Sequence, residues 1–188
     1  MSPNGATAED ASSPHATSGD EADSDPESVP RPVVGVGASA GGVTALQNFF
    51  EAIPADTDMA FVVVLHLAGD EESNLTQVLR QTAALSMVRA EDGMQVRGGH
   101  GYVIPPGTHL EIHDGRLGLR DTGKIHDTST IDHFFRSLAA DQKHNAVAIV
   151  LSGTGTDGTL GIRAIKENGG VAFVQAPAEA EYDHMPRS

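Results

Sequence analysis

The chain has 188 residues, which fits about one domain with a sizeable core. Its formal net charge of −14 excludes a generally basic surface of the kind that binds nucleic acid. Cysteine is absent, so disulfides and thiol chemistry are excluded, and no apolar run reaches the roughly 20 residues that cross a bilayer.

The first 30 residues differ in composition from the rest. They carry seven acidic residues and no Lys or Arg. Such a segment buries too little apolar area to offset the entropy lost on ordering, so we expect residues 1–30 to be a disordered acidic tail. It has neither the basic start nor the apolar stretch of a signal peptide.

The globular part is expected to begin with a buried strand at residues 31–37 that enters a Gly-rich turn. Residues 40–53 carry apolar side chains at helical spacing. The continuous apolar run at residues 59–65 is typical of a strand covered on both faces. A second helix is expected to start near Ser73, and a strand at residues 102–104 is stopped by two prolines.

A β-hairpin is predicted next. Leu110 and Ile112 alternate with polar residues, and Leu117 and Leu119 do the same on the return. Asp114-Gly115 between them is a dipeptide that suits a two-residue hairpin turn.

The last third of the chain alternates helices and strands. A helix holding Phe134 and Phe135 is predicted with Thr130 as its N-cap. A buried strand at residues 146–151 leads into a Gly-rich loop, followed by a helix at residues 160–168 that two glycines close. Residues 171–175 predict a final strand.

This alternation predicts an α/β fold: a doubly wound, mostly parallel sheet with helices on both faces and the antiparallel hairpin as an insertion or an edge. Ligands of such sheets bind beyond the carboxyl ends of the strands. The loops at Ser39, His66 and Asp157 each follow a strong predicted strand. We therefore expect all three on that edge.

The first of these loops fits two functional patterns. Gly35–Ala40 matches the dinucleotide fingerprint G-x-G-x-x-A, and Gly37–Gly41 matches the nucleophile elbow G-x-S-x-G. A merely tight strand-to-helix turn is a third possibility. A dinucleotide site wants an acidic residue at the end of the next strand, where this chain has His66.

In an elbow, small neighbours let the chain turn sharply at Ser39 and expose its hydroxyl. The backbone N–H groups of Ala40 and Gly41, at the start of the helix, could then stabilise an oxyanion. Thr154 lies in another Gly-rich loop, and its N–H is a further candidate donor.

A serine nucleophile needs a base and a carboxylate that orients the base. His66 is the candidate base because it ends a buried strand, although a structural histidine there is the alternative. Asp157 is the candidate carboxylate, and its alternative role is an ordinary N-cap of the helix that follows. The order Ser, His, Asp differs from that of the ordinary α/β-hydrolases.

The hairpin offers a separate cluster. His109, Glu111 and His113 share one strand face by period-two spacing, opposite Leu110 and Ile112. A metal site is one interpretation, but we predict a solvated face and no metal.

Several motifs together resemble the catalytic domain of the CheB-type protein-glutamate methylesterases, most closely those fused to a receptor methyltransferase. The resemblance runs from about Val33 to the end of the chain. The matching stretches are residues 34–42, 63–67, 91–94, 102–106, 132–137, 151–161 and 185–188.

The resemblance implies that residues 31–188 form a methylesterase catalytic domain with Ser39, His66 and Asp157 as its catalytic triad. The implied reaction is cytoplasmic hydrolysis of glutamate γ-methyl esters, and also glutamine deamidation, on chemoreceptor helices. No metal or organic cofactor, nucleic acid or membrane insertion is implied. A receptor methyltransferase is a further implied partner.

The chain also departs from the family pattern. It has an acidic tail where the best-known members carry a receiver domain, Gly69 where a proline is common, and Thr154 where a methionine is common. The family continues for about 20 residues past Ser188, so we expect a C-terminally incomplete domain. The alternative function is therefore a poorly active receptor-binding or regulatory module of the same fold.

Overall fold

The structure, a computed structural model, describes residues 32–65, 71–121 and 129–188, with no side-chain description for residues 71–73. The predicted tail and His66 lie outside this range. The elements are β1 (Val33–Ala38), α1 (Gly42–Glu51), β2 (Ala60–Leu65), α2 (Glu71–Thr82), β3 (Ser86–Arg89), β4 (His100–Val103), β5 (Thr108–His113), β6 (Arg116–Asp121), α3 (Thr130–Gln142), the 3₁₀ turn η1 (Lys143–Asn145), β7 (Ala146–Val150), α4 (Thr159–Glu167), β8 (Val171–Val174) and α5 (His184–Arg187).

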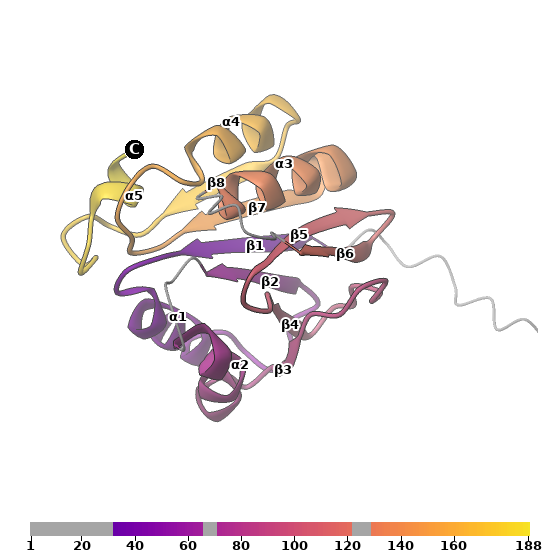
Figure 1. Ribbon diagram of the computed structural model, residues 1–188, viewed down its shortest axis with the longest axis horizontal. Helices are drawn as coiled ribbons and strands as arrows, with labels where there is room; N and C mark the ends of the chain where they lie inside the picture. The colour runs from indigo at the N-terminus through magenta and orange to yellow at the C-terminus, as the bar shows by residue number, and fades with distance from the viewer. Residues whose placement is uncertain (1–31, 66–70, 122–128) are drawn as a thin grey trace, which may run out of the picture.

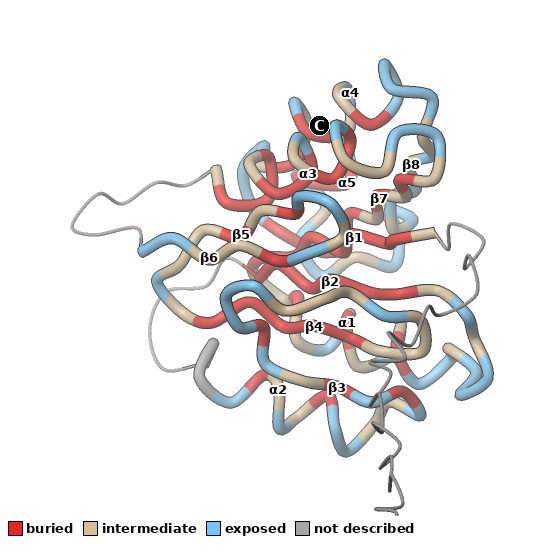
Figure 2. Tube along the Cα trace, turned by 90° about the vertical axis from the view of Figure 1, so that its right-hand side faces the viewer, coloured by how far each residue is buried: buried red, intermediate tan, exposed pale blue. Residues whose placement is uncertain are grey.

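Six strands form one parallel sheet in the order β3-β4-β2-β1-β7-β8. Helices α1 and α2 cover one face, and α3 and α4 cover the other (Figure 1). The buried apolar residues accordingly form two clusters, one with α1 and α2 and one with α3. The central strands of the sheet are mostly buried (Figure 2). The predicted doubly wound α/β fold is confirmed.

Strand β1 illustrates how the sequence determines both faces. Val34 and Val36 point into the cluster formed with α1 and α2. Gly35 and Gly37 point the other way, where a β carbon would lie 2.8 Å from Phe135 and 2.6 Å from Ile131. The missing side chains let α3 approach the sheet closely, so its first turn lies beside the end of β1.

The predicted hairpin is confirmed as an antiparallel insertion. Strands β5 and β6 form their own two-stranded sheet. Asp114 and Gly115 both have positive φ, 49° and 69°, as a type I′ turn requires. Leu110 and Ile112 are fully buried in the same cluster as α3, so the hairpin covers part of the sheet face where no helix lies.

Three features differ from expectation or were not anticipated. Strand β3 and helix α5 were not predicted, because both segments are short and lack a clear apolar run or periodicity. Thr130 is not the N-cap of α3 but its first helical residue, and Ser129, which precedes it, makes no side-chain cap. The N–H groups of this helix are satisfied from elsewhere in the chain, as described below.

The sheet ends at β8, where Val171, Phe173 and Val174 are about half exposed. The continuation of the family past Ser188 stays a prediction. In the described part of the chain, none of the helices is long and apolar enough to span a bilayer.

Candidate active site

The candidate site lies where three neighbouring parallel strands end. Strand β1 lies between β2 and β7 and pairs with both in parallel. Ser39 follows β1 directly, β2 ends at Leu65 immediately before His66, and the loop carrying Asp157 follows β7. The topology therefore brings the carboxyl ends of these strands to one edge, as the sequence predicts.

The backbone around Ser39 forms a tight turn between β1 and α1. The N–H of Ser39 donates to the carbonyl of Ser152 over 3.0 Å, and its own carbonyl accepts from Gly42 over 2.7 Å. Gly41 adopts φ of 69°, which favours glycine. These bonds fix the backbone of Ser39, the candidate nucleophile. Ser39 is 9% exposed.

Ser152 joins this turn to the end of the chain. It is 1% exposed, and its hydroxyl donates to the carbonyl of Ala40 over 2.9 Å. The same hydroxyl accepts from the N–H of Tyr182 over 3.0 Å, and the N–H of Ser152 donates to Gln175 Oε1 over 2.8 Å. Sequence reasoning missed this residue, since its only signal was a hydroxyl at the exit of a buried strand.

The loop after β7 packs directly on Ser39. A β carbon at Gly153 would lie 3.0 Å from the β carbon of Ser39 and would overlap Met185 Sδ. Gly153 also exchanges backbone hydrogen bonds with the C-terminal segment, donating to Tyr182 and accepting from Met185. The segment leading into α5 thus holds this loop against the candidate nucleophile.

Three backbone donors were predicted to form an oxyanion hole. Within the residues that the structure describes, the N–H groups of Ala40, Gly41 and Thr154 donate no hydrogen bond. Ala40 and Gly41 are the two residues after Ser39. Thr154 follows Gly153, which packs on Ser39. Donors with no protein acceptor at this edge can bind an oxygen of a substrate.

The carboxylate of Asp157 caps helix α3. Its Oδ2 accepts from the N–H of Ile131 over 3.0 Å, and its Oδ1 accepts from the N–H of Asp132 over 2.9 Å. The alternative that it caps its own following helix is wrong. That helix has Gly158 at its N-cap position, with φ of 100° and no side-chain cap.

Asp157 thus supplies the cap of α3 that was predicted for Thr130. The positive end of the α3 macrodipole favours a negative charge at Asp157. The two N–H groups take two of the about four lone-pair sites that a carboxylate offers.

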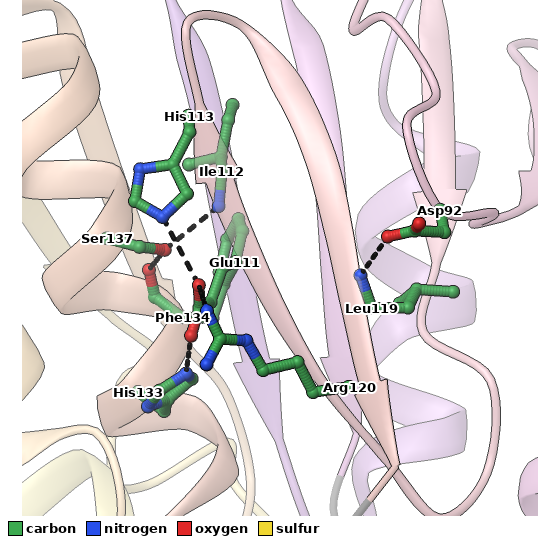
Figure 3. A network of polar contacts seen from close by, with 9 residues as sticks. All are labelled: Asp92, Glu111, Ile112, His113, Leu119, Arg120, His133, Phe134 and Ser137. Atoms are coloured by element: carbon green, nitrogen blue, oxygen red, sulfur yellow. Dashed lines mark hydrogen bonds and ion pairs between the residues drawn. The ribbon is translucent and has the colours of Figure 1, made fainter.

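The polar face of the hairpin contacts α3 through Glu111 (Figure 3). Glu111 is 13% exposed and accepts hydrogen bonds from Nε2 of His133 over 2.7 Å and of His113 over 3.2 Å. Arg120 Nη2 lies 3.5 Å from it. The predicted solvated face is therefore wrong for Glu111, because His133 of α3 packs onto it.

The metal interpretation of this face finds no support in the described ranges, which contain no group of three His, Cys, Asp or Glu able to hold an ion. Burial raises the pKa of Glu111, but the hydrogen bonds from His133 and His113 and the charge of Arg120 outweigh it. The pKa therefore lies below the ordinary 4.5.

Comparison with known proteins identifies the family and the fold of the chain. The family model described as CheB methylesterase matches residues 34–188. A Leptospira interrogans protein, provisionally named protein-glutamate methylesterase/protein-glutamine glutaminase, is 30% identical over 155 residues, which are 81% of this chain and 80% of that protein. The crystal structure of the Thermotoga maritima CheB methylesterase catalytic domain superposes with a TM-score of 0.77 at 28% identity, covering 85% of this chain and 87% of that one.

Longer relatives carry the same name without the provisional mark. One from Halobacterium salinarum is 30% identical over 184 residues, which are 95% of this chain and 51% of that protein. One from Xanthomonas oryzae is 35% identical over 161 residues, which are 82% of this chain and 44% of that protein. The chain spans about half the length of these two relatives.

The close approach at Gly153 predicts that Gly153→Ala lowers the free energy of unfolding by about 1–3 kcal/mol, because Met185 is buried and has little room to move. Urea unfolding measures this change. Gly118→Ala is the matched control, since a β carbon there meets nothing within 4 Å and the change should stay within about 0.5 kcal/mol. Equal effects of the two substitutions would contradict the prediction.

The cluster around Glu111 predicts a pH-dependent stability. A carboxylate whose folded pKa is lowered stabilises the fold above its ordinary pKa, and this contribution is lost as the pH falls through the folded value. Glu111→Gln should therefore cost about 1 kcal/mol or less at about pH 6, because its partners are largely exposed, and less still at about pH 3.5.

Urea unfolding at the two pH values measures the difference, with the exposed Glu51→Gln as control. A cost of Glu111→Gln that stays constant between the two pH values would be inconsistent with this account of the carboxylate.

Proposed function

The chain belongs to the CheB methylesterase family, a family of carboxylic ester hydrolases, and on this premise we propose that it hydrolyses glutamate γ-methyl esters on chemoreceptors. Deamidation of receptor glutamines, which the names of the relatives also contain, follows the same acyl-transfer chemistry and is part of the proposal. The cytoplasmic helices of a receptor are the proposed substrate, which puts the reaction in the cytoplasm. A receptor methyltransferase is a second proposed partner.

The proposed mechanism uses Ser39 as nucleophile. His66 removes the hydroxyl proton, and Ser39 Oγ attacks the ester carbonyl carbon to form a tetrahedral intermediate. The oxyanion accepts hydrogen bonds from among the N–H groups of Ala40, Gly41 and Thr154. The intermediate then collapses, the C–O bond to the methoxy group breaks, and the proton held by His66 passes to the methoxy oxygen, which leaves as methanol.

The second half of the reaction releases the product. A water molecule gives its proton to His66 and attacks the acyl-enzyme, and the bond to Ser39 Oγ breaks. Ser39 regains its proton from His66, and the glutamate γ-carboxylic acid leaves and loses its proton to solvent. Throughout, Asp157 orients the imidazole and stabilises its protonated form.

One observation carries this proposal. The backbone places Ser39 against the loop of Gly153, and on both sides of this contact lie N–H groups that donate no hydrogen bond within the described ranges. A nucleophile next to unused donors, at the end of a parallel strand, suits acyl transfer. A dinucleotide loop has no use for a hydroxyl held in this way.

Methanol release from methylated chemoreceptor tests the proposal directly. We expect the 188-residue chain to release methanol and Ser39→Ala to lose about a thousandfold or more of this rate, as other serine hydrolases lose when the nucleophile is removed. Ser86→Ala, which removes an exposed hydroxyl from β3, is the matched control and should keep the full rate.

Two outcomes would count against the proposal. Release that persists in Ser39→Ala would assign the chemistry to another group. A folded chain that binds receptor but releases no methanol would instead support the receptor-binding module.

A further inference from the structure

A second aspartate lies beside the proposed catalytic one. Asp132, in the first turn of α3, is 7% exposed. Its Oδ1 accepts a hydrogen bond from the N–H of Gly161, in the first turn of α4, over 2.6 Å. Its own N–H donates to Asp157 over 2.9 Å, so one residue contacts both the candidate carboxylate and the helix that follows it.

The two aspartates hold the same short connection from opposite sides. Asp157 lies two residues before α4 and binds the first turn of α3, whereas Asp132 lies in α3 and binds the first turn of α4. Each carboxylate satisfies N–H groups that no carbonyl of their own helix can reach. The path from Asp157 to α4 is therefore fixed at both ends.

Close packing of the two helices makes this exchange possible. A β carbon at Gly161 would lie 2.5 Å from the β carbon of Phe135, so the α4 backbone rests directly on α3. Only a backbone this near brings the Gly161 N–H within reach of Asp132. The contact is buried.

From this geometry we propose that Asp132 is a positioning residue for the esterase reaction. By accepting from Gly161 it fixes the start of α4, and with it the position and orientation of the Asp157 carboxylate. This inference rests on the proposed function. The side chain of Asp132 acts through Asp157 and takes no part in the bond changes.

The first test compares two substitutions in the methanol-release assay. Asp132→Ala removes the acceptor and should lower kcat about 10- to 100-fold with KM nearly unchanged, since a small misplacement of a catalytic group costs this much. Asp132→Asn keeps an amide oxygen that can accept from Gly161 and should restore kcat to within about threefold of the original chain. A folded Asp132→Asn chain as slow as Asp132→Ala would overturn the proposal.

A double-mutant cycle separates positioning from a general loss of stability. If Asp132 acts through Asp157, adding Asp132→Ala to Asp157→Ala lowers kcat no further. Effects that multiply would overturn the proposal. If Asp132→Ala is unfolded at the assay temperature, Asp132→Ser takes its place, because serine suits a helix N-terminus but is too short to reach Gly161.

Hydrogen exchange distinguishes failure of this inference from failure of the proposed function. The amide of Ile131, which donates to Asp157, should exchange faster in Asp132→Ala than in the original chain, also in a Ser39→Ala background. Methanol release that persists in Ser39→Ala would sink the proposed function alone. Unchanged exchange at Ile131 would sink the role of Asp132, whatever the enzyme does.

Discussion

The first turn of α3 presents backbone N–H groups that no carbonyl of the helix can reach, and its own N-cap side chain does not bind them. A helix end packed this close to a sheet must find acceptors in the protein. Asp157 supplies two of them from a loop more than twenty residues further along the chain. The geometry of the site depends on this contact, because it fixes the loop after β7 relative to both helices on that face.

The nucleophile turn depends on the same loop through a different set of bonds. Ser152 and Gly153 bind the backbone at Ser39 and Ala40 on one side and the segment before α5 on the other. Ser152 and Gly153, which lie just after β7, thus hold the Ser39 turn and the segment before α5 together. The described parts of the site are therefore held by the protein itself, which suits stabilisation of a developing charge.

The sequence predicts most of the fold, since hydrophobic periodicity determines the strong elements. The apolar runs at β2 and β7 and the Asp-Gly turn of the hairpin were sufficient. Short elements without such a pattern, β3 and α5, were missed. The edge on which Ser39 and the Asp157 loop meet follows from the parallel direction of the strands, which the alternation of strands and helices implies.

The contacts within the site could not be predicted in the same way. Local rules predicted Thr130 as the cap of α3 and gave a cap of α4 as the alternative role of Asp157. The structure instead caps α3 with Asp157, because tertiary packing brings that carboxylate to the end of a distant helix. The bonds of Ser152 and the contact of His133 with Glu111 also join segments far apart in sequence. A single sequence contains no signal for such pairs.

The central claim is that Ser39 is an activated nucleophile oriented through Asp157. The most direct measurement is the rate and position of covalent labelling by a fluorophosphonate ester, followed by peptide mass mapping of the original chain and Asp157→Ala. The account predicts a single adduct on Ser39 that forms at least about a hundredfold more slowly in Asp157→Ala. Labelling elsewhere, or at the same rate in both proteins, would contradict it.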